Sequence, residues 1–150
     1  MRIRLFFAAL SASVVIACSS APSYYRANTV IPAPTLAIDS LRDLVVTRVR
    51  GLGFKVYEAQ DALARLTEIN VGVNATSDFL YADRESGCGL NCRKVEALLV
   101  SFAPDENGTH QHLTVTALTS KRGWVSPWRL THPSQAVRQI ADSLSGTFRH

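Results

Sequence analysis

The chain contains 150 residues, of which 47% are hydrophobic and 19% are charged, which is the composition of an ordinary globular domain. This composition excludes wholesale disorder, collagen-like repeats and low-complexity arrays, and the length favours a single domain. The formal net charge is only +4 and basic residues are interspersed with acidic ones, so the sequence offers no electrostatic argument for a nucleic-acid partner.

The first 17 residues have the layout of a secretory signal peptide. Arg2 and Arg4 precede an almost unbroken apolar run over residues 5–17. A short positive region followed by such a run is typical of export signals, and the run is too short to span a membrane as a helix. The sequence therefore predicts an exported protein from which residues 1–17 are removed.

The apolar run ends in Val15-Ile16-Ala17-Cys18, and Ser19 follows. This segment resembles the signal of bacterial lipoprotein precursors, although Ile16 stands where Ala, Ser or Thr is commoner. The resemblance covers residues 1–22 only and implies lipidation of Cys18, whose acyl chains would hold the protein on a membrane. Ser19 implies the outer membrane, with the domain facing the periplasm. The inner membrane, the cell surface, and an ordinary secretion signal with a chance cysteine are the alternatives.

The mature chain is expected to comprise a tether and one domain. Residues 18–35 comprise the lipidated cysteine and a segment that contains Ser and Pro and shows no periodicity. This composition favours a flexible tether. Residues 36–150 carry the patterns of a folded domain. A helix is predicted from about residue 36 until the glycines at 51 and 53, on the spacing of its apolar residues: Leu41, Leu44, Val45, Val49 and Leu52.

Strand patterns follow this first helix. Residues 54–58 and 67–73 alternate apolar with polar side chains, which predicts two strands. Residues 61–66 are consistent with a wide turn or a helical turn. Residues 79–81 are consistent with a short strand before the cysteine-containing loop.

A hairpin and a second helix complete the domain. The hairpin is predicted from residues 95–102 and 113–119, joined by turn-forming residues. Apolar spacing from Val137 to Phe148 predicts a helix that begins near Ser134. This order favours an α+β fold, with two helices packed on one face of a small, mostly antiparallel sheet of three to five strands, in the order helix, strands, helix.

Cys88 and Cys92 remain once Cys18 is assigned to lipid. In an oxidising periplasm these two cysteines are expected to form a disulfide, and the intervening glycines suit so small a ring. A redox pair, half of a metal site and two free thiols are the alternatives. The spacing of three residues differs from the two-residue spacing of thioredoxin-like motifs.

Two constellations could support chemistry. His110 and His112 are two residues apart on a predicted strand, so both imidazoles share one face and could bind one metal ion, with His132, Asp105 or Glu106 as a third ligand. The simpler interpretation is a solvated strand end. A small envelope hydrolase would need a polar cleft with Asp83 or Glu85 near a histidine. No cofactor motif occurs in the sequence.

The stretch Lys121-Arg122-Gly123-Trp124-Val125-Ser126-Pro127-Trp128-Arg129 sets tryptophans among basic residues. Trp124, Trp128, Arg122 and Arg129 suit a membrane headgroup, a glycan or an envelope protein as partner. Alternatively, both rings cover the open end of the core. The favoured hypothesis is a lipid-anchored, non-catalytic binding or assembly module of the bacterial envelope, with a periplasmic metal-binding protein or an envelope hydrolase as alternatives.

Overall fold

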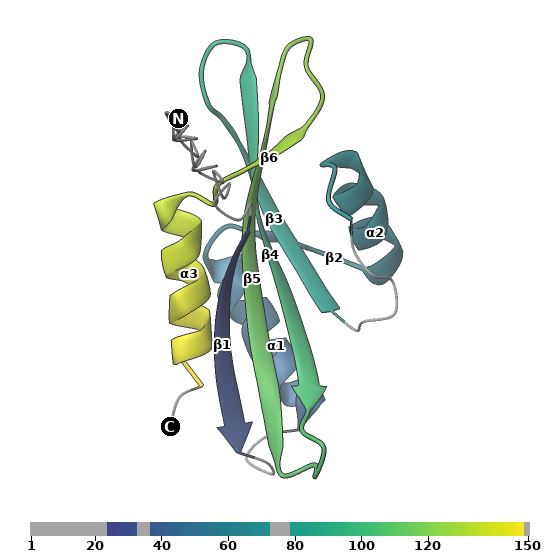
Figure 1. The fold of residues 1–150 in the computed structure, drawn as a ribbon, viewed down its shortest axis with the longest axis vertical. Coiled ribbons are helices and arrows are strands. Elements are labelled where there is room, and N and C mark those ends of the chain that lie inside the picture. Colours follow the sequence, from purple (N-terminus) through teal and green to yellow (C-terminus); the bar gives the residue numbers. More distant parts are fainter. Residues whose placement is uncertain (1–23, 33–36, 73–78, 149–150) are drawn as a thin grey trace, which may run out of the picture.

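The computed structural model describes residues 24–32, 37–72 and 79–148 (Figure 1). These residues form one antiparallel sheet in the order β1-β5-β4-β3-β2, with β6 paired to the far end of β5. The elements in chain order are β1 (Tyr24–Pro32), α1 (Ile38–Gly51), β2 (Lys55–Tyr57), α2 (Ala59–Glu68), β3 (Phe79–Gly87), β4 (Cys92–Pro104), β5 (His110–Gly123), β6 (Arg129–Thr131) and α3 (Gln135–Gly146). The predicted signal peptide and Cys18 lie outside the described residues.

The long hairpin of β4 and β5 organises the sheet. Its register runs from the pair Cys92–Gly123 to the pair Pro104–Gln111. The turn at the second end is closed by Asp105, whose carboxylate accepts hydrogen bonds from the Thr109 backbone and hydroxyl, both at 2.7 Å. The hydroxyl bond from Thr109 lowers the pKa of the Asp105 carboxyl below its usual range. The end of the hairpin at which Cys92 pairs with Gly123 extends past all three helices (Figure 1).

One face of the sheet packs against α1 and α3. Every second side chain of β4 and β5 points to this face of the sheet, because side chains alternate between the two faces of a strand. These side chains pack against the apolar stripe that repeats about every 3.6 residues along each helix. The Ser134 side chain caps α3 by accepting a hydrogen bond from the Val137 backbone at 3.3 Å. The buried residues of this larger core include Leu41, Val45, Val49, Leu98, Val100, Leu113, Val115, Val137, Ala141 and Leu144.

The opposite face carries a smaller core beneath α2. The Ser120 hydroxyl donates a hydrogen bond of 3.0 Å to the Ile69 carbonyl, which fixes the end of α2 to β5. Asn70 has φ of 63°, and this left-handed residue ends the helix. The buried members of this second core are Ala62, Leu66, Ile69, Tyr81, Val95, Ala97, Leu118 and Trp128.

The predicted fold class is wrong. The described residues form a six-stranded antiparallel sheet with three helices, and a strand, not a helix, comes first. The third helix, α2, occupies residues predicted partly as a turn and partly as the strand 67–73. A buried stripe at Ala62, Leu66 and Ile69 gives this segment a helical face, which outweighs the short alternation that follows it.

Residues 24–32, expected to belong to the tether, form the edge strand β1. They pair with β5 in register from Tyr24–Leu118 to Pro32–His110. The Thr29 hydroxyl donates to the Ser145 carbonyl at 2.8 Å, so β1 is also tied to α3. Strand β3 is also longer than the predicted residues 79–81, because it continues through charged residues to Gly87. The helix predicted from residue 36, the strand at 54–58 and the final helix are confirmed as α1, β2 and α3.

Candidate interaction surface at the loop tip

Two loops project side by side beyond the helices at the upper end of the molecule (Figure 1). We call residues 88–92, between β3 and β4, together with residues 123–127, between β5 and β6, the loop tip. The hairpin pairing of Cys92 with Gly123 holds the two loops together. The tip therefore continues the rigid central hairpin of the sheet.

A disulfide closes the first loop. Cys88 and Cys92 are bonded with their Cα atoms 5.0 Å apart, and the Cys88 backbone N–H donates to the Cys92 carbonyl at 3.1 Å. Gly89 has φ of +138°, a conformation that favours glycine. The bond therefore has the structural setting expected from the sequence, a short and tightly closed loop.

The second loop is shaped around Gly123. The Gly123 backbone N–H donates to the Ser126 hydroxyl at 2.8 Å. A Cβ atom at position 123 would lie 2.8 Å from that same oxygen, so a larger residue would displace Ser126. Glycine thus allows the turn that presents Trp124 and Val125.

The tip exposes three large apolar side chains. The exposed fraction is 103% for Leu90, 83% for Trp124 and 99% for Val125. A hollow of about 300 Å³ lies between the loops and is lined partly by Leu90 and Trp124. Scattered apolar residues are normal on protein surfaces, but three fully exposed ones on adjacent loop ends form a candidate contact site.

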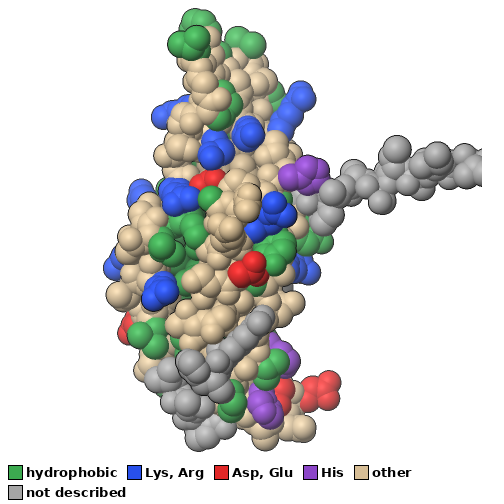
Figure 2. Space-filling view, turned by 90° about the vertical axis from the view of Figure 1, so that its left-hand side faces the viewer, with side chains coloured by type: hydrophobic (Ala, Val, Ile, Leu, Met, Phe, Trp, Pro, Cys, Tyr) green, Lys and Arg blue, Asp and Glu red, His purple; other side chains and the backbone are tan. Residues whose placement is uncertain are grey.

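Cations surround the base of the tip. Residues 86–94 and 120–129 contain five Lys or Arg residues and no Asp or Glu. We call the five the cation collar: Arg93, Lys94, Lys121, Arg122 and Arg129. Figure 2 shows hydrophobic side chains at the extreme upper end of the molecule, with Lys and Arg side chains below them.

The sheet register sets these cations directly opposite one another. Arg93 pairs with Arg122, Lys94 with Lys121, and Lys121 also with Arg129. Like charges at opposed positions of neighbouring strands destabilise a sheet. Arg93 and Lys94 are offset by ion pairs with Glu85 and Glu96, but within the described part of the chain no carboxylate pairs with the other three. The collar is therefore a site of uncompensated positive charge.

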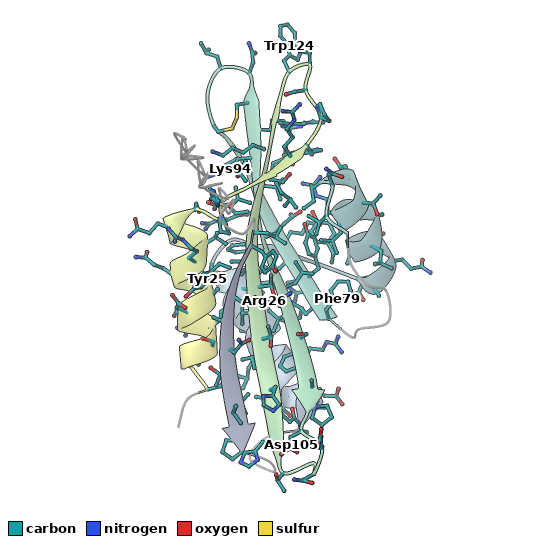
Figure 3. The ribbon with its side chains drawn as sticks, viewed as in Figure 1. Tyr25, Arg26, Phe79, Lys94, Asp105 and Trp124 are labelled. Atoms are coloured by element: carbon teal, nitrogen blue, oxygen red, sulfur yellow. A yellow bond between two sulfur atoms is a disulfide. The ribbon has the colours of Figure 1, made fainter. Side chains whose placement is uncertain are left out.

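The two tryptophans have different environments. Trp124 points into solvent at the top of the tip (Figure 3). Trp128 is only 6% exposed and belongs to the core beneath α2, so it is not part of an open partner surface. The guanidinium of Arg122 lies over the Trp128 ring, 4.9 Å from its centroid. The predicted partner residues therefore have three locations: Trp124 lies in the loop tip, Arg122 and Arg129 belong to the cation collar, and Trp128 is buried in the core beneath α2.

Asp83 occupies a buried polar cluster. It is 3% exposed and accepts hydrogen bonds from the hydroxyls of Tyr57 at 3.0 Å and Tyr81 at 2.9 Å, and from Arg65 Nε at 2.8 Å. Burial and the charge of Asp83 raise the pKa of both tyrosines, so both hydroxyls stay protonated and donate. The cluster thus ties α2 and β2 to β3.

Arg65 also links Asp83 to the surface carboxylates. It contacts Glu68 at 2.7 Å and Glu85 at 3.1 Å. Burial lowers the pKa of Arg65, but the hydrogen bonds to Asp83, Glu68 and Glu85 outweigh this effect and raise it. The hydrolase hypothesis needs Asp83 or Glu85 in a polar cleft near a histidine, whereas in the structure Arg65 forms ion pairs with both carboxylates.

Glu96 is the second buried carboxylate. It accepts hydrogen bonds from Ser134 at 2.5 Å, Arg84 at 2.9 Å and Lys94 at 3.1 Å. Burial raises the pKa of Glu96, but the bonds from Ser134, Arg84 and Lys94 outweigh it, so the pKa is lowered. Ser134 is the N-cap of α3, so this cluster joins the helix start to β3 and β4.

His110 and His112 begin β5 at the opposite end from the loop tip, beside the turn that contains Asp105, which Figure 3 labels. His132 directly follows β6, which pairs with the other end of β5. His110 Nδ1 is 2.9 Å from the Thr109 hydroxyl and 3.2 Å from Asp105 Oδ2, and His112 is exposed two residues along β5. Among residues 24–32, 37–72 and 79–148, no group of three or more His, Cys, Asp or Glu side chains is arranged to hold a metal ion.

A second hollow lies away from both the loop tip and the buried carboxylates. It has a volume of about 520 Å³ between α1 and α3, and Leu44, Leu52, Leu144 and Phe148 contribute to its lining. Among the described residues that line it, Arg48 is the one that carries a charge, and Thr47 and Thr147 contribute hydroxyl groups. No described helix is long and apolar enough to cross a membrane.

The sequence interpretation missed Leu90, Arg93 and Lys94 as parts of this surface. It singled out the stretch that contains Lys121 and Val125 but did not propose these two as contact residues. The sequence did contain a signal that could have indicated an exposed contact residue, because Leu90 is the one large apolar side chain in a loop otherwise made of Gly, Asn and Cys. Comparisons with protein-family models, with curated proteins and with solved structures found no match for this chain.

Proposed function

We propose that this chain is a lipid-anchored, non-catalytic binding or assembly module of the bacterial cell envelope, attached to the outer membrane through Cys18 and facing the periplasm. The signal-like segment that ends at Cys18 supports the anchor. The sheet and its three helices act as a rigid support for a contact site at one end.

The observation that carries this proposal is the composition of the loop tip. Leu90, Trp124 and Val125 are almost completely exposed on two adjacent loops. One loop is closed by a disulfide and the other is fixed by the Gly123–Ser126 hydrogen bond. A fixed, exposed apolar group of this kind favours intermolecular contact, since none of the residues that the structure describes buries it.

The buried polar clusters support a binding role over catalysis. Asp83 and Glu96 each accept three side-chain hydrogen bonds that connect different elements. Fully partnered carboxylates of this kind specify packing, whereas a general acid or base must reach a substrate proton. The proposed function therefore depends on the surface of the molecule.

Site-specific photo-crosslinking in the producing bacterium tests the proposal. A photoreactive residue replaces Leu90 at the tip or, as a matched control, Leu63 on α2, which is 38% exposed. We expect strong crosslinks to an envelope component from position 90 and few from position 63. Equal crosslinking from both positions, or none from position 90, would contradict a binding role for the tip.

A further inference from the structure

We propose that the loop tip inserts into the surface of an anionic phospholipid bilayer, and that this bilayer is the one that holds the lipid on Cys18. The inference about the shared bilayer rests on the proposed anchor. Insertion of the tip rests on the described residues alone.

The order of side chains along the tip matches the layers of a bilayer. Leu90, Trp124 and Val125 lie at the extreme end, and the cation collar begins with the Arg93–Arg122 pair, one residue behind the Cys92–Gly123 pair. At about 3.3 Å per strand residue, the first two collar pairs lie within about 7 Å of the base of the loops. An apolar end with cations directly behind it suits the boundary between headgroups and acyl chains, where tryptophan rings are enriched.

The collar supplies charge complementarity. Lys121, Arg122 and Arg129 have no carboxylate partner within the described residues, and each faces another cation across the sheet. Lipid phosphates would offset this repulsion and attract the tip to the surface. A neutral glycan or a purely apolar protein groove would leave the three charges uncompensated.

The geometry of β1 allows the tip and the anchor to meet one membrane. Because β1 runs antiparallel to β5, it starts at its tip-facing end, where Tyr24 pairs with Leu118. Leu118 is five residues before Gly123 on β5, which corresponds to about 17 Å. The six residues from Cys18 to Ser23 span at most about 20 Å, so the lipidated cysteine can reach the level of Gly123, at the base of the loop tip.

Quenching by brominated lipids provides the test. The full acylated protein, isolated from membranes, is reconstituted into phosphatidylcholine vesicles with or without phosphatidylglycerol, and the acyl chains carry bromine. Because Trp124 and Trp128 are the two tryptophans of the chain, comparison with Trp124→Phe isolates the signal of Trp124 and leaves the core intact. We expect at least twofold quenching of Trp124 in anionic vesicles, a blue-shifted emission, and much weaker quenching in neutral vesicles.

Charge reversal gives a matched comparison. Lys121→Glu with Arg129→Glu should abolish the quenching, whereas Arg50→Glu, an exposed change on α1, should leave it intact. Circular dichroism checks that each variant is folded. Removing the acyl chains should leave a weaker, salt-sensitive association of the tip with anionic vesicles.

The outcomes separate the two proposals. An acylated protein that floats with the vesicles while Trp124 stays unquenched would overturn the tip inference and leave the anchor standing. A wild-type protein that is isolated from membranes without any acyl chain, and whose Trp124 is still quenched by anionic vesicles, would overturn the anchor and support the tip inference. A crosslink from position 90 to a protein, with no crosslink to lipid, would also overturn the tip inference.

Discussion

Substitution of Arg65 by Met tests whether the Asp83 cluster holds α2 on the sheet. The side chains of Asp83 and Arg65 are 4% and 14% exposed, and their ion pair is 2.8 Å long. Met fills the volume of the arginine stem but leaves the Asp83 charge with two tyrosine donors. Removing one partner of a buried ion pair costs about 3–5 kcal/mol in the free energy of unfolding, because the remaining charge stays buried. At about 4 °C per kcal/mol, the melting temperature should fall by about 10–20 °C.

Urea unfolding measures this loss, with the buried Trp128 as a fluorescent reporter and the disulfide kept intact. The matched control is Glu68→Gln, which removes an Arg65 partner that is 51% exposed. Exposed ion pairs contribute about 0–1 kcal/mol, so the control should change the free energy of unfolding by less than about 1 kcal/mol. If Arg65→Met and Glu68→Gln have equal small effects, the cluster does not fasten α2 and the reasoning is wrong.

Two further predictions concern the tryptophans and pH. Trp124→Ala should change the free energy of unfolding by less than about 0.5 kcal/mol, since Trp124 is exposed, whereas Trp128→Ala should cost about 3–5 kcal/mol by leaving a cavity. Chemical unfolding compares the two variants, and similar losses would contradict their opposite burial. The lowered pKa of Glu96 stabilises the fold above the usual glutamate pKa, and this contribution is lost as pH falls through the folded-state value. Glu96→Gln should therefore show a shallower loss of stability below about pH 4.5 in acid titrations, and an unchanged slope would refute this linkage.

The helices with regular apolar spacing were predictable from the sequence. Leu41, Val45 and Val49 lie on one face of α1. Their spacing predicts a helix whichever part of the protein this face packs against. The last helix adds an N-cap at Ser134, which marks its start. Local signals of this kind do not depend on distant parts of the chain.

Strand β1 depends on a distant partner and was therefore missed. Its alternate residues Ala27, Thr29 and Ile31 are buried against β5 and α3, so a period-2 pattern was present. Serine and prolines near the segment, together with the expectation of a tether, favoured an irregular structure. Pairing with β5, whose partner residues are 78 to 94 positions away in the sequence, is what makes the segment a strand.

Strand β3 was predicted too short for a related reason. Asp83, Arg84 and Glu85 have the composition of a solvated loop, but Asp83 is buried because Arg65 and two tyrosines satisfy it. The loop tip was found only in part, since the sequence alone did not show that Leu90 lies beside Trp124. The pairing of Cys92 with Gly123 brings these residues together.

The intact mass of the protein released from membranes in mild detergent tests the central claim most directly. The account predicts a chain that starts at Cys18, carries the added mass of acyl chains, and lacks two hydrogens because Cys88 and Cys92 are bonded. Replacement of Cys18 by Ala should abolish the added mass and leave an unprocessed chain. An unacylated chain in the wild-type protein, cleaved elsewhere or still carrying residues 1–17, would contradict the membrane-anchored function proposed for it.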